Sequence, residues 1–352
     1  MLEAWDSLAR NAVEPNPFLE SWYLLPSLRA LDPSESVHIL KFTMDGIVCG
    51  IFPVKRETNY YGKPVRLIAN WTHPNCFLAS PLVAKGKEVQ FWRALFEWAD
   101  DQGRYGLFLH LSGIVLGGAL DQALRHVLAE QGRTFGLVHR EERALLRSDE
   151  TPEAYFSASL SARKRKELRR QLARLSELGE VRFDRCQGAE GLKAWIEQFL
   201  ELEAGGWKGK AGSALNARPE TALIFQSGLV GAAAYGKLER LTLRLDGKPI
   251  AMLANFVAPP GMFSFKTAYD ESYARFSPGV LLQCENLLVL DREDIAWSDS
   301  CAGEGHPMID HIWRERRALG RYNVAIGGRL RRALFSRLLK AELGRNPTGI
   351  SA

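Results

Sequence analysis

The residues that most clearly suggest a binding site in this chain are Ser277, Pro278 and Gly279. They stand between an apolar strand-like run and an apolar helical run. Serine is a good helix N-cap, and proline suits the first helical position because its missing N–H is not needed there. A glycine next to them lets a second molecule approach the backbone. The first N–H groups of a helix point outward with the positive end of its dipole. The junction therefore predicts an anion site, and it raises the hypothesis of a phosphate-bearing cofactor.

A second chemical candidate is the polar, glycine-rich loop over residues 299–310. It contains His306, whose unperturbed pKa suits proton transfer near neutral pH. It also begins with Asp299, which follows an expected core strand. In sheets of this kind the C-terminal ends of the strands tend to face the site. The alternative interpretation of His306, an ordinary turn residue before Pro307, stays open.

The elements that would position these residues occur twice, in the same order. Each copy has an Asp-Gly hairpin, a further strand-like run, a Ser-Pro pair, a helical pattern and a short strand. The hairpins lie at 43–53 and 243–253. The Ser-Pro pairs are Ser80-Pro81 and Ser277-Pro278, and the short strands lie at 105–111 and 295–298. The shared order predicts a duplicated β-turn-β-β-α-β unit. The first copy looks degenerate, because no glycine stands where Gly279 does.

Length and composition agree with two globular domains. A chain of 352 residues exceeds one ordinary domain, and 46% hydrophobic with 25% charged residues is typical of proteins with real cores. The segment 148–152 looks like a linker, so we expect domains at 1–150 and 151–345. The five cysteines are widely spaced without a C-x-x-C pair, so neither a disulfide framework nor a metal site is expected.

The chain shows no signal for export or membrane spanning. Its N-terminus lacks a basic segment followed by an apolar core, and no apolar run reaches about 18 residues. Together with the cysteine pattern this predicts a reducing, cytoplasmic setting. The net charge of +5 does not by itself indicate nucleic acid.

Helical periodicity predicts helices at 159–178, 191–204, 217–235, 309–319 and 330–343. Two segments are strongly basic, namely 163–174 and 327–345. For the first, a solvated face is the usual explanation, and contacts with the phosphates of CoA or tRNA stay open. The last helix also carries a stripe of leucine and phenylalanine, which suggests reversible contact with anionic lipid.

The run from Tyr269 to Leu282 resembles the "a-Y-D-x-x-Y-a-r-x-S-P-G-x-L-L" signature of the CelD/BcsL-type acetyltransferases, a branch of the GNAT superfamily linked with cellulose biosynthesis. The resemblance extends to 161–170, to Gly206-Trp207-Lys208 and to the Asp246-Gly247 hairpin. It implies an α/β (α+β) fold of tandem GNAT-like domains, each a mixed, mostly antiparallel sheet flanked by helices. The peptidoglycan-bridge aminoacyltransferases are doubled in a related way. On this basis 1–150 is a degenerate N-terminal domain and 151–345 the acyltransferase domain.

The resemblance also implies a donor, acetyl-CoA or a longer acyl-CoA, with its pantetheine arm between two splayed strands. Carried over by position, the donor-binding backbone is Phe276, Ser277, Pro278, Gly279, Val280 and Leu281. This chain lacks the commoner Arg/Gln-x-x-Gly-x-Gly/Ala phosphate loop of the superfamily. A plain, well-capped helix is the alternative interpretation.

Acyl transfer needs a general base for the acceptor, stabilisation of an oxyanion and an acid for the leaving thiolate. The expected catalytic residues are Asp270, Asp299 and His306, and further candidates for the base are Glu285 and Glu304. Tyr269 and Tyr273 are expected to contact the substrate or protonate the thiolate, or else to pack. Trp207 and Lys208 are expected to close over the acceptor, with a helix end and a solvated loop as the alternative.

The combined prediction is an acyl-CoA-dependent N- or O-acyltransferase acting on a cell-envelope, polysaccharide or lipid precursor. It is expected to be cytoplasmic, without a metal and without nucleic acid, and to contact the inner face of the membrane peripherally through the C-terminal basic helix. Two alternatives stay open. One is an aminoacyl-tRNA-dependent transferase, although no long helical arm is evident; the other is a non-catalytic membrane-surface binding module.

Overall fold

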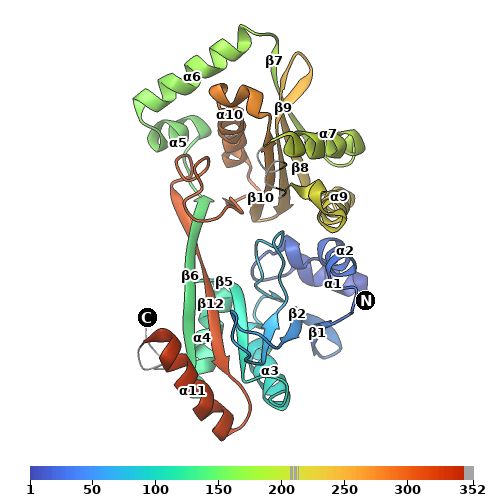
Figure 1. Ribbon diagram of the computed structural model, residues 1–352, viewed down its shortest axis with the longest axis vertical. Coiled ribbons are helices and arrows are strands. Elements are labelled where there is room, and N and C mark those ends of the chain that lie inside the picture. Colours follow the sequence, from blue (N-terminus) through green and yellow to red (C-terminus); the bar gives the residue numbers. More distant parts are fainter. Residues whose placement is uncertain (207–208, 210–211, 213, 345–352) are drawn as a thin grey trace. The chain divides into compact units, whose positions relative to one another are not determined.

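The chain forms two compact units (Figure 1). The computed structural model describes residues 1–206, 209, 212 and 214–344. Unit 1 consists of residues 1–141 and the segment that begins at Ala318, and unit 2 consists of residues 142–317. The sequence places a division at residue 150, whereas the compact units divide after Glu141 and again after Arg317.

Unit 1 is built from an N-terminal run of elements and one helix from the end of the chain. Its helices are α1 (Leu2–Arg10), η1 (Pro17–Leu19), α2 (Ser21–Leu31), α3 (Glu88–Asp101), α4 (Ala119–Glu130) and α11 (Arg329–Leu343). Its strands are β1 (Val37–Met44), β2 (Ile47–Glu57), β3 (Leu67–Asn70), β4 (Leu82–Val83), β5 (Phe108–Val115), and most of β6 (Phe135–Leu146) and β12 (Glu315–Ala325).

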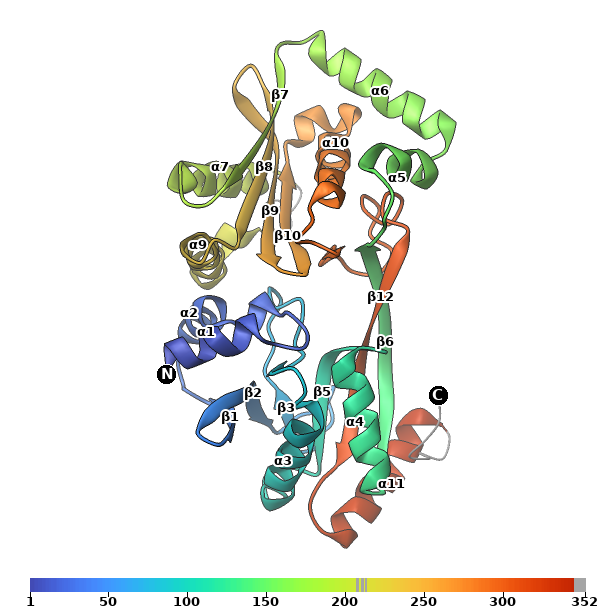
Figure 2. The same ribbon diagram turned by 180° about the vertical axis from the view of Figure 1, so that it is seen from behind.

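The sheet of unit 1 has the order β1-β2-β3-β5-β12-β6, with β4 beside β2. The pair β3–β5 is parallel, and the pairs β1–β2, β2–β3, β2–β4 and β5–β12 are antiparallel. Strand β12 therefore enters this sheet from the far end of the sequence. Helix α3 and helix α11 lie on opposite sides of the sheet (Figure 2).

Two cores hold the unit 1 sheet between its helices. Leu109 and Leu111 of β5 face a large cluster that includes Phe96 and Leu124 of α3 and α4. Because strand side chains alternate between faces, Phe108 points the other way and packs with Phe335 and Leu339 of α11. The apolar stripe of α11 is thus partly used in this core, whereas Leu330 and Leu334 are exposed. A contact of α11 with lipid stays a prediction.

Unit 2 contains the remaining elements. Its helices are α5 (Pro152–Ser159), α6 (Ala162–Ser176), α7 (Leu192–Gly205), η2 (Leu215–Ala217), α9 (Pro219–Ala234), η3 (Glu271–Phe276), α10 (Pro278–Glu285) and η4 (Asn286–Asp291). Its strands are β7 (Val181–Gln187), β8 (Leu238–Leu245), β9 (Lys248–Ala258), β10 (Gly261–Tyr269) and β11 (Trp297–Asp299).

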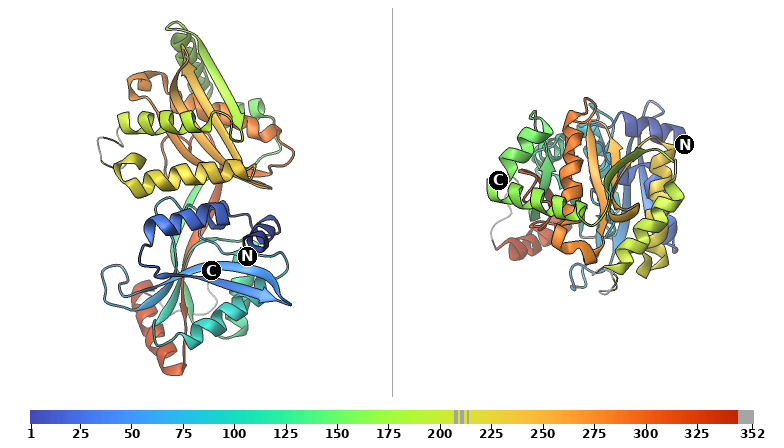
Figure 3. Two further views of the ribbon diagram at one scale, coloured as in Figure 1. Left: turned by 90° about the vertical axis from the view of Figure 1, so that its right-hand side faces the viewer. Right: turned by 90° about the horizontal axis from the view of Figure 1, so that it is seen from above.

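The sheet of unit 2 runs β11-β10-β9-β8-β7, and the end of β6 pairs with the outer edge of β11. The pair β10–β11 is parallel, and the others are antiparallel. Helices α7 and α9 cross one face of the strands, and α10 lies on the other face (Figure 3). The expected fold, a mixed and mostly antiparallel sheet flanked by helices, is confirmed in each unit.

Both predicted Asp-Gly hairpins are present. In each turn the aspartate and the glycine have positive φ, +49° and +77° at Asp45-Gly46 and +48° and +76° at Asp246-Gly247. A two-residue turn of this type needs positive φ at both positions, which Asp-Gly adopts readily. Each hairpin is followed by an antiparallel strand, a helix and a parallel strand, so the two units share one order of elements.

Three local predictions are wrong or incomplete. The helix expected over 309–319 is absent, because residues from Glu315 form β12, which pairs with β5. Ser80-Pro81 does not begin a helix, since it precedes β4 and the next helix starts at Glu88. The helix expected over 159–178 is present as α6 but is shorter at both ends, and Ser161 caps its start by accepting the N–H of Lys164.

Candidate functional site

Strand β10 presents an open edge in unit 2. It pairs with β9 along its whole length, but its parallel pairing with β11 covers only Gly261–Phe263. A register shift between Ser264 and Lys266 marks a bulge at the point where that pairing ends. A bulge bends a strand and increases its twist, which separates β10 from β11 beyond this point. The edge of β10 from Thr267 to Tyr269 therefore lies beyond its pairing with β11, where a ligand could approach the backbone.

The open edge leads to the first turn of α10. Pro278 is the first helical residue, as predicted. Ser277 occupies the N-cap position with φ of +54°, and its side chain makes no capping hydrogen bond, so the prediction of a serine cap is wrong. The N–H of Leu281 bonds to the carbonyl of Ser277. The N–H groups of Gly279 and Val280 precede this first helical bond and are therefore the donors that an anion could use.

Gly279 lies close to two side chains of the chain itself. A Cβ atom at this position would lie 2.6 Å from the sulfur of Met308 and 3.3 Å from the ring of Tyr269. The predicted loop over 299–310 is thereby packed against the start of α10. Approach of a ligand to Gly279 stays a prediction, because Met308 already occupies part of that space.

His306 lies in a turn two residues before Met308. Its Nδ1 accepts the N–H of Met308 at 3.4 Å, and its carbonyl accepts the N–H of Asp310 at 3.1 Å. A neutral imidazole that accepts at Nδ1 carries its proton on Nε2 and cannot accept there. This geometry favours the turn alternative for His306, and its role as a base stays a prediction.

Asp299 is a buried carboxylate held by two arginines. Its side chain is 0% exposed and lies 2.7 Å from Nε of Arg143 and 2.8 Å from Nη1 of Arg317. The N–H of Cys301 donates to it at 2.9 Å. Burial alone would raise the pKa of Asp299, but the charges of Arg143 and Arg317 outweigh burial and lower that pKa. Such a carboxylate stays ionised and enclosed, which favours positioning the loop over direct proton transfer.

Asp270 lies at the end of the open edge and beside a pocket. Its carboxylate accepts the N–H of Ser272 at 3.0 Å and the ammonium of Lys248 at 3.0 Å. Burial alone would raise the pKa of Asp270. The hydrogen bonds from Ser272 and Lys248 outweigh this effect, so the pKa lies below its usual value. The carboxylate is therefore ionised at neutral pH and also caps η3.

The pocket beside Asp270 has a volume of about 390 Å³, within the range of small-molecule sites. Helix α7 contributes Gln198 and Glu201 to its wall, and β9 contributes Lys248. Sequence reasoning missed these three residues. Lys248 directly follows the Asp246-Gly247 turn, which places it at the start of β9 and could have indicated it.

The remaining predicted residues divide into two groups. Tyr269 and Tyr273 are partly buried against the core of unit 2, and the ammonium of Lys248 lies 5.8 Å from the ring centre of Tyr273. Trp207 and Lys208 lie outside the described residues. Glu285 lies at the end of α10 rather than at its start, and burial raises the pKa of its carboxyl.

Unit 1 closes the corresponding splay with its own chain. Strands β3 and β5 pair only at Ile68–Leu109 and Ala69–His110. Beyond that point the amide of Asn70 donates to the carbonyls of Ala79 and Ser112, at 3.0 and 2.9 Å, and accepts the N–H of Ser112. The gap between β3 and β5 is therefore bridged by Asn70. In this respect unit 1 differs from unit 2, where the edge of β10 is open.

Comparison with known proteins identifies part of the chain. Residues 162–304 match the family model described as an acetyltransferase (GNAT) domain. This segment runs from α6 through β11 and includes the open edge of β10 and helix α10. The chain therefore contains a GNAT-superfamily acetyltransferase domain. No curated protein matches the sequence.

Solved structures share the fold at low sequence identity. FemX is 10% identical with a TM-score of 0.59, and the alignment covers 97% of this chain and 98% of that one. A conserved protein of unknown function from Bacteroides thetaiotaomicron is 13% identical, with a TM-score of 0.58 and coverage of 93% and 97%. The C-terminal domain of a putative lysylphosphatidylglycerol synthetase from Agrobacterium fabrum is 13% identical, with a TM-score of 0.55 and coverage of 100% and 98%.

Two features are absent from the described residues. None of the helices there is long and apolar enough to cross a membrane. Over the same residues, no group of three or more histidine, cysteine or acidic side chains is arranged to hold a metal ion.

Proposed function

Since residues 162–304 carry a GNAT acetyltransferase domain, we propose that unit 2 transfers an acyl group from acyl-CoA to an amine or hydroxyl of a cell-envelope, polysaccharide or lipid precursor. The observation that carries the proposal is the open edge of β10 after its bulge, which leads through η3 to the start of α10. The signature-like run from Tyr269 to Leu282 adds the proposal that the domain belongs to the CelD/BcsL-type branch.

The donor fits this arrangement by its chemistry. The amide-bearing arm of acyl-CoA would pair with the backbone of β10 beyond Lys266, as an added strand does. Its pyrophosphate would then meet the N–H groups of Gly279 and Val280, within the proposed donor-binding backbone of residues 276–281. Trp207 and Lys208 retain their proposed role at the acceptor, and so do Tyr269 and Tyr273.

Asp270 is the proposed proton acceptor from the acceptor substrate. Its ionised carboxylate borders the pocket and stands at the C-terminal end of the open edge. Lys248 keeps this carboxylate charged and adds a cation that suits an anionic or acyl-bearing acceptor. In the transfer, the acceptor attacks the thioester carbonyl, the C–S bond breaks, and Asp270 takes the acceptor's proton. His306 and Asp299 are proposed to hold the loop that covers α10.

Isothermal titration with acetyl-CoA and longer acyl-CoAs tests the donor. Val280→Pro removes one N–H in the first helical turn, where proline is tolerated, whereas Val280→Ala keeps that N–H and trims the side chain. A charge-assisted hydrogen bond is worth about 1.5–3 kcal/mol, so we expect the proline variant to weaken donor binding roughly 10- to 100-fold. The alanine variant should bind almost as the wild type does. No binding of any acyl-CoA to the wild type, or equal weakening in both variants, would refute the assignment.

Asp270→Asn tests the chemical role against a purely structural one. The matched control is Asp184→Asn, because Asp184 pairs with Arg244 at 2.7 Å and has a similar exposure, away from the pocket. We expect Asp270→Asn to lower the rate of acyl transfer by at least about 100-fold without changing donor affinity. The control variant should retain wild-type turnover. Equal turnover in the two variants would remove Asp270 from the mechanism.

Aminoacyl transfer from tRNA is the second candidate, favoured by the basic helix α6. This helix carries seven cations over 163–174 against one acidic residue. Binding of tRNA that weakens steeply with added salt, together with no binding of acyl-CoA, would favour this candidate over the first.

A further inference from the structure

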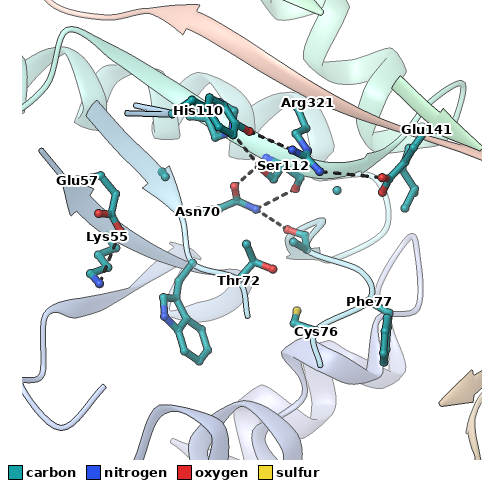
Figure 4. Close-up of a pocket in the computed structure, with 16 residues that line it drawn as sticks. Lys55, Glu57, Asn70, Thr72, Cys76, Phe77, His110, Ser112, Glu141 and Arg321 are labelled. Atoms are coloured by element: carbon teal, nitrogen blue, oxygen red, sulfur yellow. Dashed lines mark hydrogen bonds and ion pairs between the residues drawn. The ribbon is translucent and has the colours of Figure 1, made fainter. Parts of the chain in front are cut away.

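Unit 1 contains a separate cavity of about 410 Å³ on the side of its sheet that faces α11 (Figure 4). His110 and Ser112 of β5 reach it from the same face, because strand residues two apart point the same way. Arg321 of β12 and Glu141 of β6 also line it. The cavity lies wholly within unit 1, so its chemistry is independent of the donor site proposed in unit 2.

His110 lies between the hydroxyl of Ser112 and the buried side-chain amide of Asn323. The Oγ of Ser112 lies 3.1 Å from Nε2 of His110, and Nδ1 of His110 lies 2.6 Å from Oδ1 of Asn323. Asn323 is 0% exposed and His110 is 8% exposed, whereas Ser112 is half-buried at the cavity. A hydroxyl, an imidazole that can take its proton and a third group that orients the imidazole form the arrangement of an activated nucleophile.

The groups behind Asn323 fix the position of the proton on His110. The amide nitrogen of Asn323 donates to the hydroxyl of Tyr60 at 2.7 Å and to a carboxylate oxygen of Glu342 at 3.2 Å. Tyr60 in turn donates to the other oxygen of Glu342 at 2.6 Å. Because an ionised carboxylate only accepts, the amide must turn its NH₂ toward Glu342 and its oxygen toward His110. Nδ1 of His110 therefore carries the proton, and Nε2 is left to accept from Ser112.

The surroundings keep this imidazole neutral and place a cation near it. Burial lowers the pKa of His110, and the hydrogen bond with Asn323 opposes that shift only in part. The positive charge of Arg321, which lines the same cavity, also lowers this pKa. Arg321 donates to Tyr61 at 3.0 Å and lies 4.0 Å from Glu141. A cation at the cavity suits negative charge that develops on a carbonyl oxygen during attack.

We propose that Ser112 is a nucleophile that accepts an acyl group from a small activated ester or thioester bound in the unit 1 cavity. The Oγ–carbon bond forms while the bond from the acyl carbon to its leaving oxygen or sulfur breaks. The proton of the Ser112 hydroxyl passes to Nε2 of His110 and then to the leaving group. Water attacks the acyl-serine by the same route, which releases the carboxylic acid and restores the hydroxyl.

Incubation of the full chain with p-nitrophenyl acetate tests the proposal. We expect a burst of nitrophenolate equal to the protein concentration, and mass spectrometry of the acid-quenched protein should place one acetyl group on Ser112. Ser112→Ala should abolish both signals. His110→Gln keeps a polar side chain without a base, and it should slow acetylation at least about 100-fold.

Thr43→Ala is the matched control, because Thr43 is an exposed hydroxyl of unit 1 that does not line the cavity. It should retain the wild-type burst. Circular dichroism of the Ser112 and His110 variants distinguishes lost chemistry from lost folding, and a folded Ser112→Ala without a burst supports the proposal. Acetylation on Cys76 or Lys55 in place of Ser112 would overturn it. An unchanged rate in folded His110→Gln would overturn it as well.

Discussion

Replacement of Asp299 by asparagine should unfold unit 2 at a much lower temperature. The change leaves Arg143 and Arg317 facing a neutral amide in a site where the aspartate is 0% exposed. Removal of one partner from a buried ion pair typically costs about 3–5 kcal/mol, because the remaining charge loses its compensation. In domains of about 150–250 residues each kcal/mol lowers the melting temperature by roughly 2–4 °C. We therefore expect a decrease of roughly 6–20 °C, measured by calorimetry.

The matched control is Asp294→Asn. Asp294 pairs with Arg292 at 2.7 Å, but its side chain is 49% exposed. Exposed pairs contribute about 0–1 kcal/mol, so this variant should melt almost as the wild type does. The two substitutions make the same chemical change and differ in burial.

The pH dependence gives an independent test of the same reasoning. The pKa of Asp299 is lowered in the folded state, so its contribution is present above the unfolded pKa of about 3.9 and is lost as the pH falls through the folded value. The stability gap between the wild type and Asp299→Asn should be full at about pH 7 and should shrink at about pH 3. A variant that melts with the wild type but no longer transfers an acyl group would refute a structural role. That result would restore Asp299 as the catalytic base.

Two further predictions follow from close packing and from burial. Gly279→Ala should change the free energy of unfolding by less than about 1 kcal/mol in urea titrations, because its Cβ would meet the sulfur of Met308, which belongs to a flexible side chain that can shift. Among the thiols, burial raises the pKa of Cys284 to about 12 and also raises that of Cys301, whereas Cys186 is exposed. Alkylation at mildly alkaline pH followed by peptide mapping should therefore label Cys186 first, and labelling of Cys284 at the same rate would contradict the burial.

Local chemistry explains which parts of the fold could be predicted. Asp45-Gly46 and Asp246-Gly247 are found from sequence because their turns depend on two adjacent residues. The helix that begins at Pro278 is found for the same reason. By contrast, the helix expected over 309–319 fails because the residues from Glu315 belong to β12, whose neighbours β5 and β6 come from a distant part of the chain. Short-range periodicity does not contain that information.

The candidate site divides in the same way. The order of β10, Asp270 and α10 can be predicted from the sequence. The ion pairs that enclose Asp299 between Arg143 and Arg317 cannot. Arg143 lies 156 positions earlier in the chain and Arg317 lies 18 positions later. The relay through His110, Ser112 and Asn323 was also missed, since Asn323 joins β5 only through the pairing of β12. The spacing of His110 and Ser112 on one expected strand is the signal that could have suggested it.

The placement of β12 between β5 and β6 has a consequence for synthesis of the chain. Residues 1–141 leave the ribosome first, yet the facing edges of β5 and β6 have no partner until the segment after Arg317 follows. Unit 2, drawn from the continuous segment 142–317, can complete itself earlier. Unpaired strand edges invite association with other chains, and long-range pairing is slow. The sheet of unit 1, most of which is synthesised first, is therefore the last to be completed. Until then its unpaired strand edges make unit 1 the part of the chain most dependent on protection from aggregation.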